Sequence, residues 1–239
     1  MCSFLDMVSQ ACYYDHPNLP SFYRSYTAMD FDIKNFMVFA IAILYALTIH
    51  EFFHAWAANR LGDPTAKMQG RLTLNPLAHL DPMGTICFIV AHFGWGKPVP
   101  INSSYFKNPR RDDVIASAAG PISNFVSAFI FGLLFQITHR FVSDTSFFLN
   151  DFCNLLLKII QINLILAIFN FIPLYPLDGS HILKGFLPRH MLHKYEEVCK
   201  YGPFILLGLI LLGNFANIPI LYYVIWPPTI FFFKMFSGL

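Results

Sequence analysis

The feature that most constrains this chain is a pair of histidines four residues apart, with a glutamate beside the first, in a stretch apolar enough to enter a membrane. These residues are His50, Glu51 and His54, and no charged side chain occurs from Phe36 to Ile49. On an α-helix, side chains four residues apart share a face, so both imidazoles can bind one metal ion. Ionisable groups inside a membrane are costly, and where they occur they mark functional sites. The pattern predicts water chemistry at a metal ion within a bilayer.

The overall composition agrees with a membrane location. Hydrophobic residues make up 56% of the 239 residues and charged residues 13%, against about 25% charged residues in soluble domains. The chain is therefore expected to be an integral membrane protein. Its net charge of +2 and the lack of a recognised motif argue against nucleic acid as a partner. The five cysteines have no paired spacing, so neither a disulfide framework nor a cysteine-ligated metal is predicted.

Apolar stretches with helix-stopping flanks predict an all-α membrane protein, a polytopic helical bundle of about five transmembrane segments. The expected segments are 35–60, 114–139, 152–171, 203–212 and 218–236, the last of them broken at Pro227 and Pro228. They divide the chain into an N-terminal, interfacial lead-in over 1–34, a membrane-embedded core over 35–200 and C-terminal membrane segments over 201–239.

The apolar stretch from Met83 to Trp95 is short for a full span. Lysine and arginine are frequent between the first two helices and again after the third, whereas the 140–152 loop carries only Arg140. The positive-inside rule places both basic loops in the cytoplasm, which requires the Met83–Trp95 stretch to enter the membrane and return. We therefore expect a re-entrant or β-like element there, and a site that faces the cytoplasmic side of the membrane.

Two histidines are not enough for catalytic zinc, which usually has three protein ligands and one open position. Asp178 is the best candidate for the third, because Pro173 and Pro176 unwind the end of the third helix and let a carboxylate turn inward. The alternative is an ordinary turn in which Asp178 caps the helix that begins at Gly179.

Two further motifs accompany these residues: Asn-Phe-Ile-Pro-Leu-Tyr-Pro-Leu-Asp-Gly over 170–179 and Ala-Gly-Pro-Ile-Ser-Asn over 119–124. Together with the segments 60–66 and 70–76, they resemble the site-2 protease family of intramembrane zinc metalloproteases, in its compact prokaryotic branch without a PDZ or CBS domain. The resemblance implies one zinc ion held by His50, His54 and Asp178, with Glu51 as the catalytic acid/base. Ser180 stands where many relatives have a second glycine, but it is not a ligand position.

Such an enzyme hydrolyses peptide bonds within or near transmembrane segments, where a substrate helix must first be unwound to expose its carbonyls. The alternation from Arg71 to Leu74 predicts a short strand, so Leu72, Thr73 and Leu74 are candidates for pairing with an unwound substrate. Asn170 and Asn124 are candidates for hydrogen bonds to the substrate backbone, although amides inside a membrane more often join helices.

Two other functions stay open at this point: a membrane protein that binds or transports a metal, and an inactive scaffold with the same fold. Glu51 argues against both, because metal carriage needs no acid/base beside two ligands. The expected partners are a transmembrane protein substrate and membrane lipid, and no nucleic acid. A regulatory membrane partner or a homo-oligomer is left open.

Overall fold

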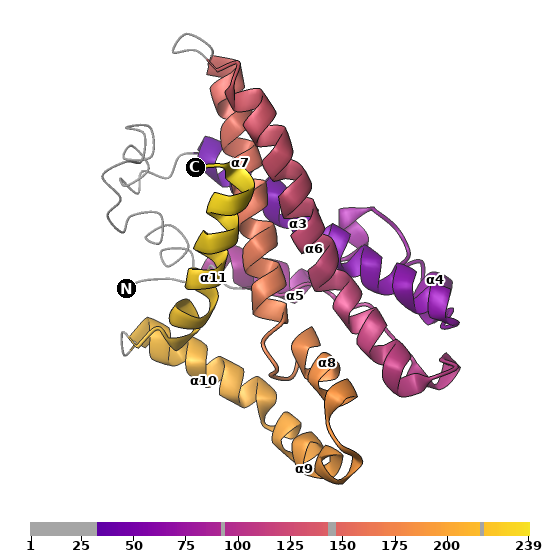
Figure 1. Ribbon diagram of the computed structural model, residues 1–239. Helices are drawn as coiled ribbons and strands as arrows, with labels where there is room; N and C mark the ends of the chain where they lie inside the picture. The colour runs from indigo at the N-terminus through magenta and orange to yellow at the C-terminus, as the bar shows by residue number, and fades with distance from the viewer. Residues whose placement is uncertain (1–32, 92–93, 143–146, 216–217) are drawn as a thin grey trace.

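The structure, a computed structural model, describes residues 33–91, 94–142, 147–215 and 218–239 (Figure 1). Nearly all of the lead-in expected over 1–34 lies outside the described residues. The elements are α3 (Ile33–Leu61), α4 (Thr65–Met68), η2 (Pro76–Ala78), α5 (Pro82–Ala91), η3 (Ser103–Tyr105), α6 (Pro109–His139), α7 (Phe147–Asn170), α8 (Asp178–Phe186), α9 (Arg189–Lys200), α10 (Gly202–Phe215) and α11 (Ile220–Ser237). Within the described residues no β-strand occurs, and the prediction of an all-α membrane protein is confirmed.

Four helices are long and apolar enough to cross a membrane, namely α3, α6, α7 and α11. The remaining expected segment is α10, whose 14 residues extend about 21 Å, less than the ~30 Å of a bilayer core. The prediction that the last segment is broken is wrong, because α11 continues through Pro227 and Pro228. A proline keeps a helical φ and removes one backbone hydrogen bond, so a helix can pass through it.

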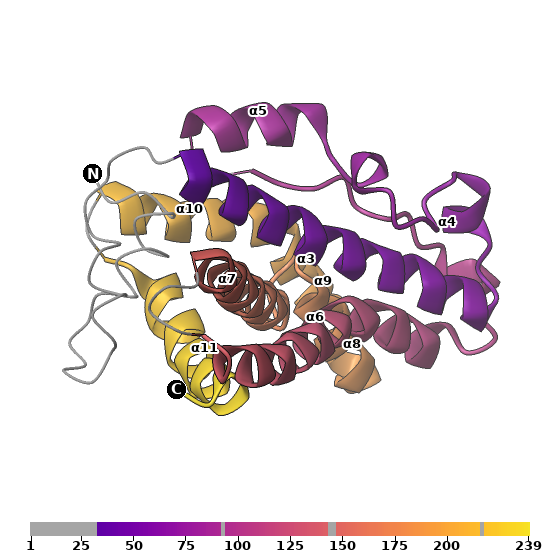
Figure 2. The ribbon, with the colours of Figure 1, turned by 90° about the horizontal axis from the view of Figure 1, so that it is seen from above.

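The long helices pack around α7, which lies between α3, α6 and α11 when the molecule is seen from above (Figure 2). Helices α3 and α6 are antiparallel, since Ala46 accepts a hydrogen bond from Asn124 while Ala58 packs with Ala116. Helices α3 and α7 are parallel, since Lys34 pairs with Asp151 near their starts and Ala46 packs with α7 further along. The ends of α3 and α7 and the start of α6 therefore share one side of the bundle.

The contact between α3 and α6 is made by residues at four-residue spacing, and most of them are small. Small side chains let two helix backbones approach closely inside a membrane. The buried residues of α3 on this line are Ala42, Ala46, His50, His54 and Ala58, and those of α6 are Ala116, Gly120, Asn124 and Ala128. The two metal-ligating candidates of α3 thus lie within the contact between α3 and α6.

The segment around α5 leaves the bundle and returns to the same place. Helix α5 has ten residues, about 15 Å in length, which is half of a bilayer core. The residues on either side of it meet, because Leu80 and Gly96 form an isolated antiparallel bridge and the Lys97 amide donates to the His79 carbonyl at 2.9 Å. The re-entrant course expected for this segment therefore agrees with the structure.

The strand expected from Arg71 to Leu74 does not form, since Leu72 and Thr73 are bends. Local hydrogen bonds occupy this segment instead. The Thr73 hydroxyl accepts from the Asn75 amide at 3.2 Å, and the Thr73 carbonyl contacts Nε2 of His79 at 2.8 Å. Such side-chain bonds to nearby backbone compete with strand pairing, and the β-like pairing of this region lies at Leu80 and Gly96 instead.

Candidate metal centre

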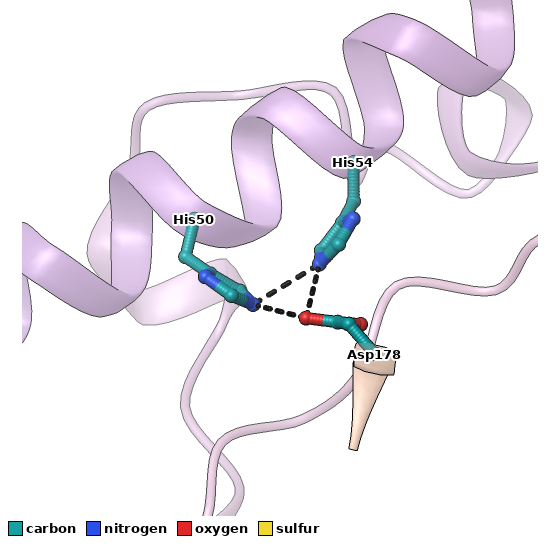
Figure 3. A group of neighbouring side chains, drawn as sticks. All are labelled: His50, His54 and Asp178. Carbon is teal, nitrogen blue, oxygen red and sulfur yellow. Dashed lines mark hydrogen bonds and ion pairs between the residues drawn. The ribbon is translucent and has the colours of Figure 1, made fainter. Parts of the chain in front are cut away.

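Three ligand-type atoms converge where α3 approaches the start of α8. His50 and His54 project from α3 toward Asp178, the first residue of α8 (Figure 3). Oδ2 of Asp178 lies 3.0 Å from Nε2 of His50 and 3.2 Å from Nε2 of His54, and the two Nε2 atoms are 3.0 Å apart. These residues form the metal-type cluster found among the described residues. The structure therefore brings together the three ligands predicted from the sequence.

The other nitrogen of each imidazole is held by an acceptor. Nδ1 of His50 lies 2.6 Å from Oδ1 of Asn124, and Nδ1 of His54 lies 2.8 Å from the carbonyl oxygen of Ala116. Because both partners accept hydrogen bonds, each Nδ1 carries the hydrogen and each Nε2 of a neutral imidazole presents a lone pair. Metal-binding histidines usually have this arrangement.

The donor set fits a zinc ion. The two Nε2 lone pairs and the carboxylate oxygen face one another with no hydrogen between them, so these three atoms repel one another. A cation between them would remove the repulsion. Zinc bonds of about 2.0–2.1 Å in a tetrahedron separate ligand atoms by about 3.3 Å, close to the observed 3.0–3.2 Å. Imidazole and carboxylate are also common zinc ligands.

Asp178 reaches the site because α7 ends at Asn170 and the chain turns before α8 begins. The capping alternative is wrong, since Leu177 is the N-cap residue of α8 and no side chain caps that helix. The side chain of Asp178 is 21% exposed, whereas those of His50 and His54 are 5% and 7% exposed. The site is therefore closed behind the histidines and more open beside the aspartate.

Helix α8 is fixed by the first turns of α6. Arg110 donates from Nε to the Gly185 carbonyl at 2.9 Å and from its amino group to the Leu187 carbonyl. Nδ1 of His181 pairs with Oδ2 of Asp113 at 3.1 Å. Since His181 lies one turn after Asp178, these contacts hold Asp178 in place.

Gly120 makes room for both imidazoles. A Cβ at this position would lie 2.3 Å from Nε2 of His54 and 2.9 Å from Cε1 of His50. Helix α6 begins at Pro109, so Gly120 and Pro121 both lie in its interior. The absence of a side chain at Gly120 thus admits the imidazole rings of His50 and His54.

Glu51 is buried next to the centre and held by the backbone. Its Oε2 accepts a hydrogen bond of 2.9 Å from the Val99 amide. Pro98 and Pro100 lack an amide hydrogen, so Val99 is the backbone donor that this stretch can offer. The contact fixes one carboxylate oxygen of Glu51.

Arg71 supports the same stretch and was not among the residues predicted from the sequence. It is buried, and its guanidinium donates to the Lys97 carbonyl, two residues before Val99. Burial lowers the pKa of Arg71 and the negative charge of Glu51 opposes this shift. A guanidinium stays charged in proteins, so Arg71 places a positive charge on the side of Glu51.

The candidate substrate contacts lie in different surroundings. Asn124 is fully buried behind His50, and its amino group bonds Ala46 and Asn163, so it does not face a substrate. Asn170 is half-buried at the end of α7 and bonds the Leu166 carbonyl of its own helix. Leu74 is exposed, while Leu72 and Thr73 are half-buried. The substrate contacts expected for Asn170 and for residues 72–74 remain predictions.

Comparison with known proteins agrees with this geometry. The model of Peptidase family M50 matches residues 38–211. The chain belongs to this family. It is 41% identical over 191 residues to the "Putative zinc metalloprotease YwhC" of Bacillus subtilis (strain 168), covering 78% of this chain and 83% of that protein.

A second relative, the "Putative zinc metalloprotease Rip2" of Mycolicibacterium smegmatis, is 37% identical over 103 residues, which is 41% of this chain and 38% of that protein. No solved structure matches significantly. The predicted resemblance to the site-2 protease family is confirmed, and so are the predictions of a membrane-embedded metalloprotease and of zinc as its cofactor.

Replacing Gly120 with alanine is expected to lower the zinc content of the purified M50 peptidase to well below one ion per chain. The added Cβ would overlap Nε2 of His54, although alanine otherwise favours a helix over glycine by about 1 kcal/mol. Metal content by emission spectroscopy measures the effect. Gly208→Ala on α10 is the matched control, because nothing lies within 4 Å of its Cβ position. Equal zinc in both variants would contradict the role assigned to Gly120.

The contact between His181 and Asp113 is expected to make the docking of α8 depend on pH. The hydrogen bond to Asp113 raises the pKa of His181, with burial opposing and the charges of Asp113 and Asp178 adding to the rise. The stabilisation is therefore complete below the ordinary histidine pKa of about 6.5, and it is lost as pH rises through the higher value of the folded protein.

The melting temperatures of the wild type and of His181→Gln should therefore differ most at about pH 6, and the difference should shrink as the pH rises above the ordinary histidine pKa. A difference that stays constant over this range would show that the pairing does not depend on the charge of His181.

Proposed function

We propose that this M50 peptidase cleaves transmembrane protein substrates with His50, His54 and Asp178 as its zinc ligands and Glu51 as its acid/base. The observation that carries the proposal is the convergence of the three ligand atoms within 3.2 Å inside a bundle of apolar helices. Zinc bound there would lower the pKa of its bound water and polarise the scissile carbonyl. The remaining steps belong to the side chains of the chain itself.

Glu51, buried beside the centre, is our candidate for the proton transfers. We propose that its free carboxylate oxygen takes a proton from the attacking water and delivers it to the leaving nitrogen, so that one water is consumed per bond cut. The Val99 amide holds the other oxygen, which keeps the carboxylate from rotating away. A metal carrier has no use for a carboxylate fixed in this way, and this disfavours the transport alternative.

The open side of the centre gives the direction of approach. Asp178 is the most exposed of the three ligands, so a substrate would arrive along the start of α8 and the end of α7. Asn170 lies at that end, and we keep it as the candidate contact to an unwound substrate backbone. Residues 72–74 are a second candidate for contacting the substrate backbone. Since no strand edge forms there, they would do so through single carbonyl or amide contacts.

We further propose that the centre faces the cytoplasm of a prokaryotic cell. The parallel course of α3 and α7 puts the basic stretches on one side of the bundle, including Lys107 before α6 and Lys194 on α9. The positive-inside rule assigns that side to the cytoplasm.

The two chemical roles can be separated by substitution. Glu51→Gln keeps size and hydrogen bonding but removes the base, so we expect close to one zinc per chain and almost no cleavage of a helical membrane substrate. Asp178→Asn weakens a ligand and is expected to lose both zinc and cleavage. Metal analysis and peptide cleavage by the purified protein measure both. Normal cleavage by Glu51→Gln would rule out the hydrolytic role and favour metal transport.

The topology can be tested with single cysteines in a cysteine-free background. Cysteines that replace Lys107 and Lys194, both exposed, should react with an impermeant thiol reagent from the cytoplasmic face only. A cysteine that replaces Arg140, at the other end of α6, serves as the control and should react from the opposite face. Labelling of Lys107 and Lys194 positions from different faces would exclude a common centre for α3 and α8.

A further inference from the structure

Asn163 is a fully buried amide on α7 that the proposed mechanism does not use. Its Nδ2 donates to the Ile159 carbonyl at 2.8 Å, and its Oδ1 accepts from Nδ2 of Asn124 at 2.8 Å. Asn124 in turn contacts His50, so three helices are joined by side-chain amides that end at a metal ligand. An amide buried among apolar helices is costly unless every polar atom finds a partner.

The direction of each hydrogen bond follows from the backbone carbonyls at the ends of this chain of contacts. A carbonyl only accepts, so the amino group of Asn163 must face Ile159, and its oxygen must face Asn124. The amino group of Asn124 must then face both Asn163 and the Ala46 carbonyl, 2.9 Å away. Both of its hydrogens are thereby used.

The oxygen of Asn124 is consequently left facing Nδ1 of His50 at 2.6 Å. That nitrogen must carry the hydrogen, and Nε2 presents its lone pair toward His54 and Asp178. Reversing either amide would place two acceptors or two donors against each other at several contacts.

We propose that Asn163 is a positioning residue that fixes the amide of Asn124 and through it holds His50 as the tautomer able to bind zinc. This role rests on His50 being a zinc ligand, as proposed above. His54 needs no such relay, because the carbonyl of Ala116 holds it directly and a backbone carbonyl cannot flip. His50 depends on an amide that can flip, and Asn163 opposes the flip.

A purely structural role would have a different signature. If Asn163 only joined helices, its loss would lower stability and leave metal binding in the folded protein unchanged. If it orients His50, its loss should weaken metal binding and change the ligand field even in protein that stays folded.

The test uses the full-length protein in detergent with Co²⁺ alone as the probe, read by its visible absorption and by chelator competition. Asn163→Leu removes both hydrogen bonds at similar volume and should weaken Co²⁺ binding about tenfold, the lower end of the effect of deleting a group that supports a metal ligand. Its absorption bands should also shift. Asn163→Asp should recover most of the affinity, because a buried, neutral carboxyl can donate to Ile159 and accept from Asn124.

Thr229→Val on α11 is the matched control. Thr229 is buried and bonds the carbonyl four residues earlier, as Asn163 does, but it has no contact with the centre. It should change stability without changing affinity or spectrum. Wild-type affinity and spectrum in Asn163→Leu would overturn the relay. If Asn163→Leu does not fold, the Co²⁺ affinity and absorption spectrum of Asn163→Ala test the relay instead. A wild type that binds no Co²⁺ would overturn the metal centre itself, which is a separate result.

Discussion

The close antiparallel contact of α3 with α6 is the constraint on which the rest of the centre depends. Nδ1 of His54 reaches a main-chain carbonyl of the neighbouring helix, that of Ala116, at 2.8 Å. The space for the rings exists because position 120 has no side chain. Alanines at the same spacing continue the contact on both sides. The two candidate histidine ligands are therefore part of the helix packing, and a change in the packing of α3 against α6 would move them.

The polar groups beside the centre contribute more to orientation than to stability. Hydrogen bonds between membrane helices average only about 0.6 kcal/mol, whereas a buried polar group left without a partner costs about 1–3 kcal/mol. Asn124 has partners on α3 and α7 for its amino group and His50 for its oxygen. Each of these hydrogen bonds adds little stability when it forms, but losing one would leave a buried polar group without a partner. The network therefore favours one orientation of the Asn124 amide over the other.

The helices and the meeting of the three candidate ligands could be predicted from the sequence because they depend on local patterns. An uninterrupted apolar stretch defines α3, four-residue spacing places His50 and His54 on one face, and prolines release Asp178 from the end of α7. The start of α6 was placed too late, since its first turn carries charged residues that an apolar pattern does not include.

The contacts of Asn124, Asn163 and Val99 depend instead on which helices become neighbours. No local pattern carries that information, and an asparagine that supports a ligand looks in sequence like one that binds a substrate. The failed strand at residues 72–74 has a similar origin, because its alternation is genuine but His79 and Asn75 take the hydrogen bonds that a strand would need.

The re-entrant course of α5 is what allows a site formed by α3 and α8. If the segment around α5 had crossed the membrane, α6 would begin on the far side and α7 would run antiparallel to α3. Asp178 would then lie at the opposite face, one helix length away. Helix α7 has 24 residues, so that displacement would be about 36 Å at ~1.5 Å per residue, against the 3.0 Å observed between Asp178 and His50. The pairing of Leu80 with Gly96 therefore helps to bring Asp178 to the same side of the bundle as His50.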